Sequence, residues 1–404
     1  MELDRAVPAL LLKLGSYPLH HGGVGVLRSL GRCGVDVYAV TEGRFTPAAM
    51  SRHLRGRFSW PTSGGEDPAE LAEGLHGIAR ALGRPAVLVP TDDESAIAIS
   101  ELRDDLADDF LFPRCADPGL PRLLASKEGL AQVCARHRIP TPHTVVPTSL
   151  ADVEDYAAHG AFPVVVKSRA PFERHLHPSV RSSTVVGTAD ELRVMALDWD
   201  DEPWVILQEY LPQEESEDWV VHAWTDGADT VVFTGVKVRS WPPHAGFTTA
   251  GRARWNPELA ALARRLFAAV GFAGIADLDF RRDRRDGCYK LVDFNPRVGA
   301  QFRLFEDAAG LDVVRAQHLA LTGRPLPHAE FPEGRAFVVE DFDYVARLAY
   351  RHERTDGPAP AGRAPSTEHG WFALDDPLPV LPMVIGRARP VVARARRKVR
   401  LRRR

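Results

Sequence analysis

The sequence predicts an α/β protein that begins with an open parallel sheet and continues into an α+β region. Short apolar runs alternate with helical stretches over roughly the first 120 residues, which is typical of a parallel sheet with crossover helices. Further on, an apolar strand ends at Lys167, and two strands around a turn place acidic residues on one face. At roughly 150 residues per domain, the 404 residues suffice for two or three domains.

The first strand is an apolar run that stops at Gly15. A helical stretch and two further apolar runs follow it. The predicted elements are a strand over 9–14, a helix over 24–30, and strands over 35–40 and 85–90.

His20 to Gly25 opens the first helix and includes three glycines. We expect this helix start to face the cleft and hold an anionic substrate group. A dinucleotide fingerprint is the alternative, but a third glycine at the expected place and an acid after the second strand are both missing. Thr91-Asp92-Asp93-Glu94, just past a strand, either lines the same cleft or simply caps a helix.

The middle of the chain mixes helices with antiparallel strands. Ser126 can cap a helix that Pro140 breaks. The predicted elements are helices over 127–137 and 257–270, strands over 162–167 and 205–211, an antiparallel pair over 219–224 and 230–238, and a hairpin over 275–280 and 289–295.

The hairpin is the most informative local feature. Side chains alternate along a strand, so Asp277 and Asp279 share one face, and Asp293 and Asn295 share another. If the strands pair, three carboxylates and an amide converge, and a hard cation such as Mg²⁺ would neutralise them. A solvent-facing side with acids paired to neighbouring arginines is the alternative.

Two lysines and a strand end add to this pattern. Lys127 at a helix start opposes the helix dipole, and Lys167 ends an apolar strand; each fits a phosphate partner or an ordinary surface lysine. Gln208, Glu209, Tyr210 and Leu211 could offer backbone groups to an adenine edge, or simply end a strand. Asp218 could accept from ribose hydroxyls, or be a surface acid.

Taken in order, these segments resemble the ATP-grasp superfamily over about residues 121–324. Lys127 and Lys167 resemble its two phosphate lysines, LQEYL with Glu209 and Leu211 resembles its adenine hinge, and Asp218 its ribose acid. ADLDF and LVDFNPR carry the strongest resemblance, which assigns Asp279, Asp293 and Asn295 to the metal and Arg297 to the transferring phosphate. The resemblance implies a Rossmann-like domain over 1–120, a two-lobed ATP-grasp domain over 121–325 and a C-terminal extension over 326–404.

One departure concerns the segment after Lys167. The family often has a glycine-rich loop there, whereas residues 168–180 contain no glycine. Arg169, Arg174, His175 and His177 stand there instead and could clamp phosphate electrostatically, although the usual backbone cradle is in doubt.

The resemblance implies a carboxylate–amine ligase that uses ATP and Mg²⁺, with Mn²⁺ as a possible substitute. A substrate carboxylate would become an acyl phosphate, which an amino-acid-like amine captures as an amide. Lys237, Arg303 and Arg297 are the expected catalytic residues. A carboxylating enzyme on the same scaffold and a non-catalytic ATP-binding module are the alternatives.

Composition limits the partners. The net charge of -3 gives no overall reason to expect nucleic acid, and four widely spaced cysteines fit a reducing cytoplasm. No signal peptide and no membrane span are predicted. The basic tail over 387–404 is interpreted as a solvated terminus, with weak attraction to anionic lipid as the alternative. A homodimer is an expectation for which the sequence supplies no evidence.

Overall fold

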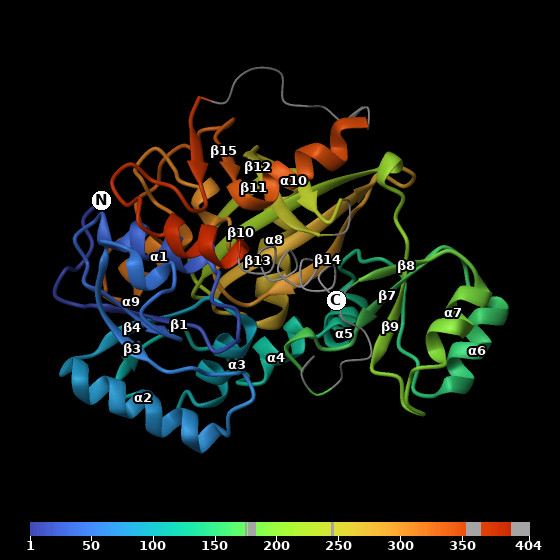
Figure 1. Ribbon diagram of the computed structural model, residues 1–404, viewed down its shortest axis with the longest axis horizontal. Helices are drawn as coiled ribbons and strands as arrows, with labels where there is room; N and C mark the ends of the chain where they lie inside the picture. The colour runs from blue at the N-terminus through green and yellow to red at the C-terminus, as the bar shows by residue number, and fades with distance from the viewer. Residues whose placement is uncertain (174–175, 177–182, 244–245, 353–364, 389–404) are drawn as a thin grey trace, which may run out of the picture.

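The computed structural model describes residues 1–173, 176, 183–243, 246–352 and 365–388. They form three sheets with helices packed on them, and the smallest sheet stands apart as a lobe on the right of Figure 1. Arg174, His175 and His177, which could clamp phosphate according to the sequence, lie outside the described residues, as does the tail from 389 onward.

The N-terminal sheet is five-stranded, with all its neighbouring strands parallel, in the order β3-β2-β1-β4-β5. Its strands are β1 (Ala9–Leu12), β2 (Val37–Thr41), β3 (Leu54–Ser59), β4 (Ala86–Pro90) and β5 (Phe110–Leu111). Helices α1 (His21–Gly31) and α9 (Val313–Leu321) pack on one face, and α2 (Pro68–Leu82) and α3 (Asp93–Glu101) on the other. The open parallel sheet that the sequence predicts is therefore present.

The small lobe is a four-stranded antiparallel sheet in the order β6-β9-β7-β8. Its strands are β6 (Thr144–Val145), β7 (Val164–Ser168), β8 (Thr184–Val186) and β9 (Val205–Glu209). Helices α6 (Leu150–His159) and α7 (Ala189–Ala196) share an apolar core with it. The predicted strands over 162–167 and 205–211 correspond to β7 and β9.

The large sheet has seven strands in the order β14-β13-β10-β11-β12-β15-β16. Its strands are β10 (Ser216–Thr225), β11 (Thr230–Trp241), β12 (Phe247–Ala253), β13 (Gly274–Asp283), β14 (Tyr289–Asn295), β15 (Ala336–Val338) and β16 (Thr367–His369). Helices α4 (Leu120–Ala125), α5 (Lys127–His137) and α8 (Pro257–Val270) share a core with one face. Ser126 caps α5 by accepting from the N–H of Gly129, as predicted.

The C-terminal region is joined to the body of the molecule. β15 pairs with β12, β16 pairs with β15, and α10 (Glu340–Ala349) packs against β11 and β12. The predicted C-terminal extension over 326–404 therefore adds β15 and β16 to the large sheet within its described residues. The stretch over 355–370 is rich in Pro, Ala and Gly, which predicts a linker or long loop. It ends in β16, and its residues 355–364 lie outside the described part of the chain.

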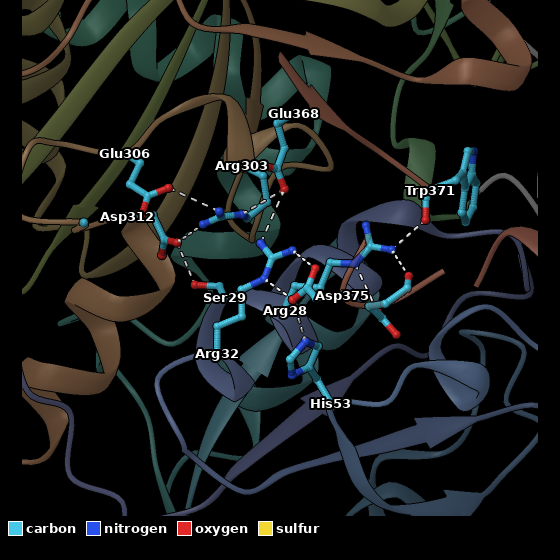
Figure 2. A network of polar contacts seen from close by, with 12 residues as sticks. Arg28, Ser29, Arg32, His53, Arg303, Glu306, Asp312, Glu368, Trp371 and Asp375 are labelled. Carbon is cyan, nitrogen blue, oxygen red and sulfur yellow. Dashed lines mark hydrogen bonds and ion pairs between the residues drawn. The ribbon is translucent and has the colours of Figure 1, made fainter. Parts of the chain in front are cut away.

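A buried polar network fastens the C-terminal segment to α1 (Figure 2). Arg28, 1% exposed, donates from Nε to Asp376 at 3.0 Å and from Nη2 to the carbonyl of Trp371. Asp376, fully buried, also accepts from Ser51 Oγ at 2.8 Å and from the N–H of Arg52. Because both charges are desolvated and fully partnered, the pair specifies how this segment docks.

We predict that Asp376→Asn lowers the free energy of unfolding by about 3 kcal/mol, because it leaves the Arg28 charge buried with an incomplete partner. The neighbouring Asp375, whose ion pair with Arg32 is exposed, provides a matched control. Asp375→Asn should cost less than about 1 kcal/mol. Urea denaturation of both variants measures the difference, and equal losses would contradict the role given to Asp376.

Candidate active site

The acidic face of the β13–β14 hairpin meets side chains of α5, β7 and β11, and we call this region between the small and large sheets the cleft. Strand register pairs Asp277 with Asn295 and Asp279 with Asp293, so these side chains share one face as the sequence predicts. The opposite face is apolar: Leu278, Phe280 and Phe294 are buried in the core beneath α5 and α8.

The acids of this face are paired with lysines from other elements. Lys127, at the start of α5, forms an ion pair with Asp293. Lys237 on β11 places Nζ 2.8 Å from Asp279 Oδ1. The alternative in which these acids pair with arginines of their own hairpin does not hold for Asp279 or Asp293. Two cations therefore already stand beside the predicted metal ligands.

The donor set fits a hard cation. The side-chain amide of Asn295 donates to the carbonyl of Asp277 at 3.1 Å, which leaves its oxygen as the acceptor beside two carboxylates. Within the described ranges, no group of three His, Cys, Asp or Glu residues is placed to hold a metal. Asp279, Asp293 and Asn295 would thus be a partial oxygen shell, which phosphate oxygens of a nucleotide can complete.

Arg297 is held between two acids from different domains. Its Nη1 donates to Asp277 Oδ2 at 2.9 Å, and its Nε lies 3.4 Å from Asp93 Oδ1 at the start of α3. Asp277 in turn lies 3.3 Å from Nε2 of the buried His222, its cross-strand neighbour. A side chain at Gly299 would collide with both His222 and Asp277, so glycine is required above this pair. The arginine is therefore fixed at the junction of the N-terminal and large sheets.

Lys167 faces the same cleft from β7. Its Nζ donates to Gln208 Oε1 at 2.7 Å, and Gln208 donates onward to Thr144 Oγ1 at 3.1 Å. Burial, and then the nearby Lys127, lower the pKa of Lys167 to about 8. A lysine that is desolvated beside another cation is poised to take an anionic partner.

The segment after β9 connects the two sheets. Glu209 accepts from Arg285 at 2.9 Å, and its own N–H donates to the carbonyl of His143. Arg281 holds Asp218 through two hydrogen bonds of 2.6 and 2.9 Å and also donates to the carbonyl of Leu211. Arg281 thus joins Asp218 to Leu211, whereas the side chain of Glu209 is held by Arg285.

The N-terminal domain supplies acids that the sequence suggested only as an open alternative. Asp92 caps α3 and also accepts from the N–H groups of Leu14 and Gly15, while Asp93 and Glu94 begin the helix. Burial raises the pKa of Asp93 to about 6 and that of Glu94 to about 7. The segment is therefore both a helix cap and part of the cleft, and the ion pair of Asp93 with Arg297 was not visible in the sequence.

Arg303 is not brought together with the other predicted site residues. It is 4% exposed, and its guanidinium faces three carboxylates: Asp312 at 2.8 Å, Glu306 at 3.2 Å and Glu368 at 3.6 Å (Figure 2). The sequence predicted a substrate role for Arg303. It could not show these partners, because the three acids lie 3 to 65 positions further along the chain and only the fold brings them to Arg303. The structure shows that its charge is already matched by internal partners.

The glycines of α1 act through packing. A Cβ at Gly22 would lie 3.0 Å from Ala300 Cα, and one at Gly25 would lie 2.9 Å from the ring of Phe302. His20 caps the helix by accepting from Gly23. The close approach brings α1 against the segment after Arg297, which is how the N-terminal domain reaches the cleft.

Comparison with known proteins assigns the fold. No family model matches the chain. D-aspartate ligase from Enterococcus faecium (strain Aus0004) is 24% identical over 246 residues, which is 57% of each chain, so the match spans little more than half of that relative. Among solved structures, N5-carboxyaminoimidazole ribonucleotide synthetase in complex with ADP matches with a TM-score of 0.62 at 14% identity, covering 87% of both chains.

The biotin carboxylase domain of the 2-oxoglutarate carboxylase from Hydrogenobacter thermophilus, in complex with MgADP and bicarbonate, matches with a TM-score of 0.59 at 14% identity. That match covers 83% of this chain and 74% of the other. N5-carboxyaminoimidazole synthetase from Staphylococcus aureus, in complex with ADP, matches with a TM-score of 0.59 at 12% identity over 82% of this chain and 81% of the other. The chain has the ATP-grasp fold.

We predict that Lys167→Ala weakens ATP binding by at least about tenfold but leaves adenosine binding unchanged, because it removes a charge-assisted contact to phosphate. Isothermal titration with ATP and with adenosine measures both. Lys290, which forms an ion pair with Asp283 near the β13–β14 turn, is the matched control. Equal weakening of ATP and adenosine would show that Lys167 shapes the lobe and does not contact phosphate.

The lowered pKa of Lys167 also predicts a pH dependence. Below about pH 8 the amine is charged and attracts phosphate, and above it the free protein loses that charge. The dissociation constant of ATP should therefore rise above pH 8, by up to about tenfold per pH unit. The charges of Lys127, Arg281, Asp279 and Asp293 also act on this amine, so a control must keep them unchanged. Lys167→Arg is that control: its guanidinium stays charged, so its affinity for ATP should stay constant up to about pH 9.5. A level profile in the native chain would contradict the assignment.

Proposed function

We propose that this protein is an ATP-dependent carboxylate–amine ligase that forms an amide through an acyl phosphate. The observation that supports it is the convergence of Asp279, Asp293 and Asn295 with Lys127, Lys167 and Arg297 in one cleft of an ATP-grasp fold. The two carboxylates and the amide supply oxygen ligands for a metal ion, and the two lysines and the arginine supply positive charge for the phosphates of a nucleoside triphosphate.

The nucleotide would lie between the two sheets. The segment from Gln208 to Leu211 would receive the adenine, and Asp218, oriented by Arg281, would accept from ribose hydroxyls. Lys127 and Lys167 would hold the phosphates. Magnesium held by Asp279, Asp293 and Asn295 would neutralise charge on the transferring phosphate.

The ion pairs of the cleft suggest how binding proceeds. Lys127 and Lys237 now neutralise Asp293 and Asp279, the two carboxylates that a cation would need. When a nucleotide and its cation arrive together, each lysine can exchange its carboxylate for a phosphate oxygen. The exchange conserves the number of paired charges, so the desolvated acids are never left without a partner.

In the reaction, an oxygen of the substrate carboxylate attacks the γ-phosphorus and ADP departs. The amine nitrogen then attacks the acyl carbon, and phosphate leaves with the bonding electrons. Arg297 would stabilise charge on the transferring phosphoryl group. Asp93, with its raised pKa and its place beside Arg297, would hold the incoming ammonium and accept its proton.

The similarity to D-aspartate ligase favours an amino acid as one of the two substrates. A carboxylating reaction is the second candidate, because the structural neighbours include an N5-carboxyaminoimidazole synthetase and a biotin carboxylase domain bound to bicarbonate. A non-catalytic ATP-binding module is the third, and the paired acids and lysines of the cleft do not favour it.

Phosphate release from ATP distinguishes these functions. We predict release that depends on both a carboxylate and an amine, measured over pairs of D- and L-amino acids with mass detection of the amide. Release that requires bicarbonate, with label from bicarbonate in the product, would show a carboxylase. ATP binding without release under any pair would show a non-catalytic module.

We predict that Asn295→Ala or Asp293→Asn lowers phosphate release by at least about a thousandfold, because the cation loses a ligand. The melting temperature should change little. Asp286→Asn in the β13–β14 turn, 46% exposed, is the matched control and should keep full activity. Near-normal release in the Asn295 and Asp293 variants at ordinary magnesium would refute the metal assignment.

A further inference from the structure

The C-terminal helix carries apolar side chains on its outer face. Residues 380–388 are helical, and Leu381, Val384 and Ile385 recur at the spacing of one helix face. They are 49%, 50% and 43% exposed, whereas Pro382 and Met383 on the inner face are buried. Both faces of this helix are therefore apolar.

The apolar face continues into the segment that precedes the helix. Leu374 is 91% exposed and Leu378 is 48% exposed. From Pro377 to Gly386 the sequence has no charged or hydrogen-bonding side chain. A helix on the surface of a globular protein normally turns polar residues outward, so several exposed apolar side chains on one helix and just before it indicate an interaction site. We call Leu374, Leu378, Leu381, Val384 and Ile385 the outer apolar face.

The helix is held firmly on the body, so this exposure does not come from fraying. Met383 belongs to the main apolar core, and Gly386 lies against Leu19. Arg387 donates to Asp341 at 2.7 Å and lies 3.9 Å from the ring centre of Phe342. Asp376, just before the helix, is fixed by Arg28. The outer apolar face is thus presented in one orientation.

The sequence that follows the helix is strongly basic. Residues 387–404 include ten arginines and lysines and no acid. The whole chain has a net charge of -3, so this positive charge is concentrated at one place. An exposed apolar face directly followed by a basic run is the pairing that binds the surface of a bilayer containing anionic lipid.

We propose that the outer apolar face and the basic run dock this protein on the surface of an anionic lipid bilayer. Leucine, valine and isoleucine side chains would enter the boundary between headgroups and acyl chains, and the arginines would contact the headgroups. Within the described part of the chain, no helix has the length and apolarity to cross a membrane, so the protein would lie on the surface. A nucleic acid would pair with the arginines but would leave the apolar face in water, and a second copy would bring the two basic runs together.

Co-sedimentation of the full chain with vesicles tests the proposal. Vesicles of phosphatidylcholine alone are compared with vesicles that also contain phosphatidylglycerol. We expect binding to the anionic vesicles only. The double variant L381Q/I385Q should reduce this binding about tenfold, since two apolar side chains no longer enter the bilayer. A chain ending at Ala388 should lose about a hundredfold or more, since most of the basic run is removed.

The matched control is V194Q/L197Q on and just after α7, where Val194 and Leu197 are 66% and 81% exposed. It makes the same polar changes on the small lobe and should bind vesicles like the native chain. Circular dichroism should show that all variants fold. Phosphate release without vesicles should be the same in L381Q/I385Q as in the native chain. Vesicle binding is measured without any ligase substrate, so failure of the ligase assignment would not affect this test.

Three results would overturn the proposal. Equal binding to both kinds of vesicle would exclude recognition of anionic lipid. Full binding by L381Q/I385Q would show that the apolar face stays out of the bilayer. Absence of vesicle binding, with either duplex DNA binding or a dimer in sedimentation velocity that L381Q/I385Q abolishes, would assign the surface to a nucleic acid or to a second copy.

Discussion

Charge balance in the cleft is the constraint on which the rest of the molecule depends. Two desolvated carboxylates on one hairpin need cations, and the chain supplies them from α5 and β11, with a third lysine from β7. These elements lie far apart in sequence and belong to different layers. The large sheet and its helix α5 thus neutralise the hairpin acids, and the small lobe adds Lys167 beside the place where a triphosphate would lie.

The N-terminal part of the chain contributes to this charge balance through the ion pair between Asp93 and Arg297. Asp93 and Asp277 approach the same guanidinium from the parallel sheet and from β13. Close packing of Gly22 and Gly25 of α1 against the segment after Arg297 sets the distance between the two domains. An acid with a pKa near 6 thereby stands beside the predicted phosphate arginine. The surroundings of Arg297 thus depend on how α1 and α3 pack against the large sheet.

The local sequence pattern was enough to predict most of the helices and strands and the acidic face of the hairpin. Alternation placed Asp279, Asp293 and Asn295 on one face, and Ser126 and Pro140 bounded α5, because these features depend on neighbours in sequence. The partners of Arg303 and the pairing of β15 could not be predicted in this way. Asp312, Glu306 and Glu368 surround Arg303, and β15 joins β12, only through the tertiary fold, which periodicity does not encode.

The C-terminal segment links the position of the cleft to the outer surface. Arg28 on α1 holds Asp376, and the helix that follows lies against Leu19, which belongs to the loop between β1 and α1. That loop also contains Tyr17 and His20: burial raises the pKa of Tyr17 and lowers the pKa of His20, and the charge of Arg297 also acts on both. Buried and close-packed contacts thus connect the C-terminal helix, through α1 and the loop before it, to the residues that surround Arg297.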